Sequence, residues 1–174
     1  MKILLHICCG VCAGGVVERL KFEGHEVVGF FYNPNIQPAD EYRRRLEVAK
    51  IVARELDFPL EIPDYDPHEW FDVAGAMDKE PEGGARCTLC YRLRLSRTAA
   101  LLQRSGCDAM ASTLTTSPHK RATVVNQVGR EVAGESFLQR DFKKQDGFKR
   151  ANELATKWGI YRQNYCGCLC SIRQ

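Results

Sequence analysis

This sequence has no hydrophobic run long enough to cross a membrane or to act as a signal peptide. Residues 1–5 are mostly apolar, but His6 and Cys8 end the run after a few residues. Internal repeats, low-complexity tracts and an interdomain linker are absent as well. The chain has 174 residues, of which 44% are hydrophobic, which is enough to build one packed core. We therefore expect a single cytoplasmic domain that spans residues 1–174.

Known phosphate-binding loops are also missing. The glycine pairs Gly14-Gly15 and Gly83-Gly84 match neither the P-loop nor the dinucleotide fingerprint. The loop after the first predicted strand lacks the Ser-Gly-Gly-x-Asp-Ser type of pattern found in pyrophosphatases. The sequence therefore predicts no nucleotide cofactor.

Cysteine is absent between Cys12 and Cys87, although the chain has nine cysteines in all. Most of them fall into tight groups within residues 8–12, 87–90 and 166–168. In a reducing cytosol, grouped cysteines are more often metal ligands or catalytic thiols than structural disulfides. We interpret the three groups as one metal or redox site that the fold assembles from separate loops.

Two cysteine pairs together supply four thiolates. Cys87 and Cys90 lie one helical turn apart at the start of a predicted helix, where the helix dipole and Arg86 favour the thiolate form. With Cys8 and Cys9 they give the four ligands that a [4Fe–4S] cluster needs. A structural zinc ion with the same four ligands is the alternative, but it would leave the other grouped sulfurs without a use.

The remaining cysteines allow several interpretations. The spacing of Cys166 and Cys168 suits a small, strained and readily reduced disulfide, metal binding, or an inert loop. Cys12 is either a further ligand, for example to a second metal ion, or a buried thiol. Cys107 and Cys170 are expected to be packing residues.

Apolar segments alternate between strand and helix patterns. Strands are expected at 2–7, 26–32, 59–62 and 108–113, and helices at 13–23, 39–56, 67–77, 87–105, 115–133 and 147–158. This alternation predicts an α/β domain, a three-layer sandwich with a mainly parallel, Rossmann-like sheet. The loops that follow the four strands should meet at one edge of that sheet, where ligands bind in such folds. His119 is expected near a helix N-terminus at that edge.

Basic and aromatic residues are interleaved in the last third of the chain, although the net charge is only +3. Such a pattern suits phosphate groups and unstacked bases, and a solvated helix face is the alternative. The basic residues in question are Arg140, Lys143, Lys144, Lys149, Arg150 and Arg162.

Several motifs together resemble one family. They are Leu5-His6-x-Cys8-Cys9-x-x-Cys12, Tyr32-Asn33-Pro34-Asn35-Ile36, Glu41-Tyr42-x-x-Arg45, Pro81-Glu82-Gly83-Gly84-x-Arg86-Cys87-x-x-Cys90, Thr115-Thr116-Ser117-Pro118 and Tyr165-Cys166-Gly167-Cys168. This combination, which covers nearly the whole chain, resembles the QueH-type epoxyqueuosine reductases. Many members have Ala-Pro where this chain has Gly10-Val11, a change that leaves the sulfurs untouched.

The resemblance implies a cobalamin-independent enzyme that reduces epoxyqueuosine to queuosine at the wobble position of tRNA, the last step of queuosine biosynthesis. It implies a fold related to the adenine-nucleotide α-hydrolases. It also implies a [4Fe–4S] cluster on Cys8, Cys9, Cys87 and Cys90, with the remaining pair, Cys166 and Cys168, redox-active. A second iron on Cys12 and an external electron donor fit the same chemistry.

The resemblance also suggests how the substrate is held. Removal of an epoxide oxygen as water needs two electrons, two protons and a group that polarises the C–O bond. Candidate proton donors or substrate contacts are Asp64, Asp66, His119, Tyr32, Asn33 and Asn35. The basic residues of the last third would then contact tRNA phosphates. A zinc-stabilised RNA-binding module and an iron–sulfur electron carrier are the alternatives.

Overall fold

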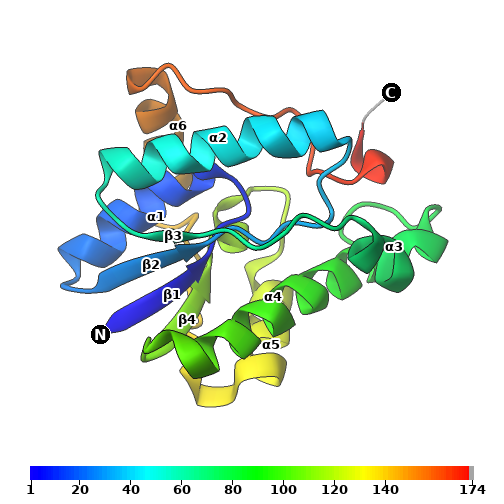
Figure 1. Ribbon diagram of the computed structural model, residues 1–174, viewed down its shortest axis with the longest axis horizontal. Helices are drawn as coiled ribbons and strands as arrows, with labels where there is room; N and C mark the ends of the chain where they lie inside the picture. The colour runs from blue at the N-terminus through cyan, green and yellow to red at the C-terminus, as the bar shows by residue number, and fades with distance from the viewer. Residues whose placement is uncertain (173–174) are drawn as a thin grey trace.

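The computed structural model describes residues 1–172 and contains a four-stranded parallel sheet (Figure 1). The strands are β1 (Lys2–His6), β2 (Glu26–Phe30), β3 (Leu60–Glu61) and β4 (Ala109–Ser112), in the order β3-β2-β1-β4. Leu4 of the central strand β1 pairs with Val28 of β2 and with Met110 of β4. All strand pairs are parallel, so the loops at the carboxyl ends meet at one edge, as predicted.

Helices cover both faces of the sheet (Figure 1). One layer contains α1 (Gly10–Phe22), α2 (Ala39–Glu55) and α6 (Gly147–Lys157), and the other contains α4 (Ala85–Ser105) and α5 (Ala122–Ala133), with α3 (His68–Ala74) against α4. Short 3-10 turns lie at Gly75–Met77, Thr113–Thr116, Gly134–Ser136 and Leu169–Ser171. The predicted three-layer α/β sandwich is confirmed.

The central strand explains why the two layers form. Side chains alternate along a strand, so Ile3 and Leu5 of β1 belong to the apolar core under α1 and α2. Leu4 belongs to the second core, under α4 and α5. Both faces of β1 are therefore buried, which positions the end of the strand, and the cysteines after it, in the middle of the sheet.

The first helix begins earlier than the sequence indicated. The prediction was residue 13, but α1 begins at Gly10, and Cys9 is its N-cap, with its sulfur accepting the Cys12 N–H at 3.3 Å. A Cβ on Gly10 would lie 2.7 Å from Val48 of α2, so this glycine allows the two helices to approach closely. As a result, Cys12 lies in the first turn of α1, next to the cysteine pair.

The helix predicted to begin within residues 115–118 was placed too early. Residues 113–116 form a 3-10 turn and α5 begins only at Ala122, so His119 is not at a helix N-terminus. The Lys143 ammonium donates to the carbonyl groups of Thr115 (3.2 Å) and Lys120 (3.1 Å). These bonds occupy carbonyls at both ends of the segment and hold it as a loop. Within residues 1–172 no helix is both long and apolar enough to span a bilayer.

Candidate metal centre

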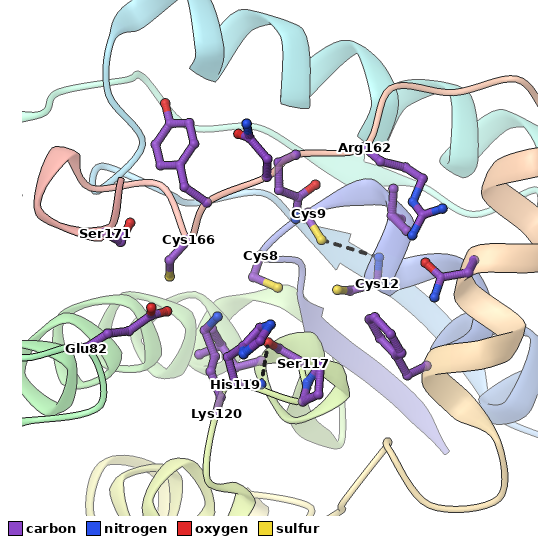
Figure 2. A pocket seen from close by; sticks show the side chains of 18 of the residues that line it. Cys8, Cys9, Cys12, Glu82, Ser117, His119, Lys120, Arg162, Cys166 and Ser171 are labelled. Atoms are coloured by element: carbon purple, nitrogen blue, oxygen red, sulfur yellow. Dashed lines mark hydrogen bonds between the residues drawn. The ribbon is translucent and has the colours of Figure 1, made fainter. Parts of the chain in front are cut away.

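A cavity of about 210 Å³ opens at the carboxyl edge of the sheet. Its walls come from the loop after β1, the loop between β4 and α5, the start of α6 and the segment before the C-terminal 3-10 turn. Figure 2 shows the sulfurs of Cys8, Cys12 and Cys166 pointing into this space, opposite His119 and Lys120. Two of the three predicted cysteine groups therefore reach the same cavity.

Three sulfurs form a compact group on the β1–α1 loop. The Sγ atoms of Cys8, Cys9 and Cys12 all lie within 4.8 Å of one another. Cys9 and Cys12 are buried and Cys8 is half-buried. Thiolates that share a single ion at a metal–sulfur distance of about 2.3 Å lie this close together. The group can therefore hold a metal, and Cys12 belongs to it.

The pKa values of the three thiols diverge because the thiols share hydrogen bonds. Bonds from Cys12 and Cys9 hold the pKa of Cys8 well below its ordinary value, and the charges of Lys120 and Arg94 act in the same direction. The bonds with Cys8 and Cys9, together with burial, raise the pKa of Cys12 well above its ordinary value. The group thus favours the charged form at Cys8 and the neutral form at Cys12, and a bound cation would replace the remaining protons.

The second pair lies in the first two turns of α4. Cys87 packs in the same apolar core that Cys8 contacts, and Cys90 packs against Trp70 and Cys168. Burial raises the pKa of both Cys87 and Cys90 above the ordinary value. It outweighs the Gly83 hydrogen bond and the Arg86 charge at Cys87, and the Arg94 charge at Cys90. A metal would provide the positive charge that these buried sulfurs need as thiolates.

Each sulfur of the four predicted cluster ligands accepts a hydrogen bond. The donors are the Thr113 hydroxyl to Cys8 (3.2 Å), the Cys12 N–H to Cys9 (3.3 Å), the Gly83 N–H to Cys87 (3.2 Å) and the Arg94 guanidinium to Cys90 (3.9 Å). Hydrogen bonds to the sulfurs are one of the means by which proteins stabilise iron–sulfur clusters and set their potentials. The donor set therefore fits a thiolate-ligated metal centre.

Two cations face these sulfurs. Burial lowers the pKa of Arg94, but Cys90, Cys8 and Cys166 outweigh it and raise the pKa. In the same way, Cys166 and Cys8 outweigh burial and hold the pKa of Lys120 above its usual range. Arg94 is fully buried, and a buried charge is costly unless an opposite charge accompanies it. Both cations therefore fit a site that carries net negative charge.

The Cys166 and Cys168 side chains have different surroundings. Cys166 is half-buried and lines the cavity, whereas Cys168 is buried against Trp70 and Cys90. All nine cysteines of the chain, which lie within the described residues, are free thiols in this structure. That Cys166 and Cys168 alternate between dithiol and disulfide stays a prediction.

Only one of the predicted proton donors lines the cavity. His119 is exposed at the cavity wall, and its main-chain N–H donates to the Ser117 hydroxyl at 3.3 Å. Asp64 and Asp66 are exposed away from the cavity lining. Asp66 accepts the His68 N–H at 2.9 Å, a contact that helps to begin α3. A substrate contact by either aspartate stays a prediction.

The predicted contacts after β2 are buried and do not line the cavity. Asn33 joins the two cysteine loops, because its Oδ1 accepts from Arg94 at 2.6 Å and its Nδ2 donates to the Ile7 carbonyl at 2.9 Å. Asn35 is buried beside Gly167. The Tyr32 hydroxyl donates to Glu69. Direct contact of these side chains with a substrate stays a prediction.

Two of the predicted phosphate contacts form ion pairs with α1 or with its C-cap residue, Glu23. Arg140 lies 3.1 Å from Glu23, and Arg150 lies 2.7 Å from Glu18. The same Arg150 also pairs with Glu153 of its own helix. These exposed pairs are weak, so a phosphate could compete with the carboxylates.

The other four basic residues differ in their surroundings. Lys143 donates to main-chain carbonyls of the loop at residues 115–120, whereas Lys144 and Lys149 are exposed. Arg162 lines the cavity. The contact of all six residues with tRNA stays a prediction.

Sequence patterns missed the residues that support the sulfurs. Arg94 lies four residues after Cys90 and therefore on the same face of α4, a spacing that could have revealed it. Thr113 follows β4, but nothing local indicates that its hydroxyl contacts Cys8. Lys120 is next to the predicted His119, and only the fold shows that its charge faces the sulfurs.

Comparison with known proteins identifies the family. The family model described as "Epoxyqueuosine reductase QueH" matches residues 3–174. Proteins named "Epoxyqueuosine reductase QueH" include that of Streptococcus pyogenes serotype M1, 38% identical over 97% of this chain and 69% of its own length. Those of Acinetobacter baylyi (36% identical; 99% and 81%) and Thermotoga maritima (32% identical; 98% and 90%) are also similar.

A solved structure shares the fold. It is described as a predicted subunit of a tRNA methyltransferase from Methanocaldococcus jannaschii, and it matches with a TM-score of 0.58 and 15% identity over 90% of this chain and 76% of that chain. At this identity the likeness concerns the Rossmann-like architecture alone. The near-complete family match and the relatives above 30% identity decide the family: this chain belongs to the QueH family of epoxyqueuosine reductases.

Proposed function

We propose that this chain is an epoxyqueuosine reductase that uses a [4Fe–4S] cluster held by Cys8, Cys9, Cys87 and Cys90, without cobalamin. Family membership supports the reaction. The observation that supports the ligand set is that each of these four sulfurs accepts a hydrogen bond from a neighbouring group.

Sulfur spacing sets a condition on how Cys8 and Cys9 would bind the cluster. The ligands of a four-iron cluster bind different irons, so their sulfurs lie farther apart than those that share one ion. Cys8, Cys9 and Cys12 lie within 4.8 Å of one another, so the Cys8 and Cys9 side chains would turn apart to bind two different irons of the cluster. Cys12, beside them, would then be the ligand to a second iron.

The reaction requires two electrons and two protons. Both C–O bonds of the epoxide break, the oxygen leaves as water, and a carbon–carbon double bond forms. When bound, the cluster would supply electrons one at a time from an external one-electron donor, and a neighbouring iron would act as a Lewis acid. The Cys166–Cys168 dithiol would buffer two electrons.

The chain's own groups would bind the substrate and deliver protons. His119 is the predicted proton donor that the cavity geometry favours, because it lines the wall that also carries Lys120. The substrate would be a tRNA whose exposed anticodon loop presents the modified base to the cavity, since unstacked loop bases are the ones that proteins reach. Arg162 lines the same cavity and suits a neighbouring phosphate. We place the reaction in the cytoplasm, where tRNA is available.

The test is turnover of tRNA that carries epoxyqueuosine by anaerobically prepared protein with a chemical reductant, followed by nucleoside mass spectrometry. Wild-type protein should form queuosine, and Cys87→Ser should form none. Cys107→Ser is the matched control, because Cys107 is half-buried at the end of α4, away from the cavity lining, and it should retain turnover. Wild-type protein that binds its full iron content and still forms no queuosine would refute the proposal.

A further inference from the structure

Arg45 of α2 uses all three of its guanidinium nitrogens inside the protein. The side chain is 1% exposed and its Nε donates to Glu41 at 2.7 Å. Its Nη1 donates to the main-chain carbonyl of Cys166 at 2.9 Å, and its Nη2 donates to that of Tyr165 at 3.1 Å. One buried charge therefore binds the carbonyls of the peptide units on both sides of Cys166.

Neighbouring contacts fix the same segment from other directions. The Arg45 guanidinium lies over the Tyr165 ring, 4.8 Å from its centroid, and the Tyr165 hydroxyl donates to the Gln37 carbonyl. The Gln37 N–H in turn donates to the Gly167 carbonyl at 2.9 Å. The segment is thus bound to the loop before α2 on both sides of Cys166.

Gly167 shows how closely this segment approaches its support. Its φ is +144°, a conformation that favours glycine. A Cβ at this position would lie 2.7 Å from the Asn35 side-chain nitrogen. On the other side, the Gly167 N–H donates to the Ser171 hydroxyl at 3.3 Å, and that hydroxyl donates to the Cys168 carbonyl at 2.7 Å. The backbone at Cys166 therefore has little freedom.

Stability alone does not explain this arrangement. A buried ion pair is often no more stabilising than apolar side chains of similar size, because both charges lose their hydration. Residues 160–168 form neither helix nor strand, so regular backbone hydrogen bonds do not hold them. The Arg45 contacts replace those bonds at the place where the Cys166 thiol turns into the cavity (Figure 2).

We propose that Arg45, oriented by Glu41, is a positioning residue that holds the Cys166 thiol over the metal centre for the reduction. This inference rests on the proposed function for its catalytic consequence, but its structural part does not. Misplacement of a reacting group by about 1 Å can reduce a rate about a hundredfold. Loss of the Arg45 contacts should therefore reduce kcat by about that factor and leave KM nearly unchanged.

The experiment compares Arg45→Lys and Arg45→Met with Arg54→Met in anaerobically prepared, metal-loaded protein. Arg54 lies on the same helix, and its side chain is 73% exposed, so its removal is the matched control. The structural readout is the rate of Cys166 alkylation by iodoacetamide, with the exposed Cys170 of the same molecule as the internal reference. Peptide mass spectrometry measures both rates, and iron analysis verifies the loading.

In Arg45→Met, iodoacetamide should alkylate Cys166 at least tenfold faster, relative to Cys170, than in the wild type. The iron content should be unchanged. Arg45→Lys keeps a positive charge beside Glu41 but cannot reach both carbonyls, so it should show a smaller increase and decides the question if Arg45→Met does not fold. Wild-type alkylation rates in a folded Arg45→Lys, together with wild-type kcat, would overturn the proposal. If Cys166 is alkylated faster in the Arg45 variants but the wild type shows no turnover, the proposed function is refuted and the positioning role of Arg45 stands.

Discussion

The Thr113 hydroxyl contacts Cys8 twice: it accepts the Cys8 N–H at 2.9 Å and donates to the Cys8 sulfur at 3.2 Å. Thr113 is fully buried and directly follows β4, whereas Cys8 follows the neighbouring strand β1. One hydroxyl therefore fixes both the loop and the sulfur whose pKa is lowered mainly by the hydrogen bonds from Cys12 and Cys9.

Thr113→Val keeps the shape of the side chain and removes both contacts. Because a hydrogen bond to a ligand sulfur stabilises the more negative, reduced cluster, the variant should have a lower midpoint potential. The buried Cys8 N–H also loses its acceptor, so the free energy of unfolding should fall by about 1–3 kcal/mol. A redox titration followed by electron paramagnetic resonance measures the potential. Thr113→Ser retains the hydroxyl and should match the wild type; equal potentials in the Val and Ser variants would contradict this role.

Cys12 and Cys90 should differ in what their removal does to the cluster. Cys90→Ser removes a proposed cluster ligand, so the protein should lose most of its iron and acid-labile sulfide. Cys12→Ser should keep about four irons per chain, because its sulfur is the proposed ligand of a separate iron and not of the cluster. Iron and sulfide analysis of the two variants, prepared in parallel, makes the comparison. Full cluster content in Cys90→Ser together with its loss in Cys12→Ser would reverse the assignment.

Arg94 connects the two cysteine pairs through Asn33, which binds the backbone just before Cys8. Arg94→Met should lower the free energy of unfolding by about 2 kcal/mol, since a hydrogen bond to a charged group contributes about 1.5–3 kcal/mol. It should also lower the cluster potential, because a positive charge beside the sulfurs is lost. Urea unfolding measures the first effect and a redox titration the second. Arg104→Met, at an exposed position near the end of the same helix, should change neither; equal effects of the two substitutions would exclude a specific role.

Lys143 and Lys149 should affect tRNA binding differently. Lys143 is occupied by the carbonyls of Thr115 and Lys120, whereas Lys149 is exposed. Each phosphate contact contributes about 0.7–0.9 to the slope of log K against log salt concentration. Lys149→Met should therefore reduce that slope by about one. Lys143→Met should leave the slope unchanged and lower kcat through the loop that carries His119. A reduced slope for Lys143→Met would instead identify it as a phosphate contact.

Local patterns were sufficient for the layers and for the position of Cys8 at the carboxyl edge of the sheet. The strand β1 is apolar on both faces and the cysteines follow it directly, so both its burial and the position of Cys8 could be predicted. The start of α1 was wrong, because Cys9 caps the helix with a sulfur and Gly10 permits a close approach to Val48. Neither effect has a local signal in the sequence.

Long-range contacts account for what the sequence could not predict. The segment that carries His119 was predicted to be helical, but it forms a loop. The Lys143 side chain, distant in sequence, binds two of its carbonyls. Arg45 belongs to one of the motifs that resemble the QueH family. Its contacts with Tyr165 and Cys166, however, join residues 120 and 121 positions apart in the sequence. Contacts of this kind form only in the assembled fold, so local sequence patterns do not predict them.

Iron, zinc and acid-labile sulfide analysis of anaerobically purified protein tests the central claim most directly. The account predicts about four or more irons per chain with about four sulfides, as a [4Fe–4S] cluster requires, and broad visible absorption. A colourless protein that holds one zinc ion and no sulfide, even after anaerobic reconstitution with iron and sulfide, would contradict it.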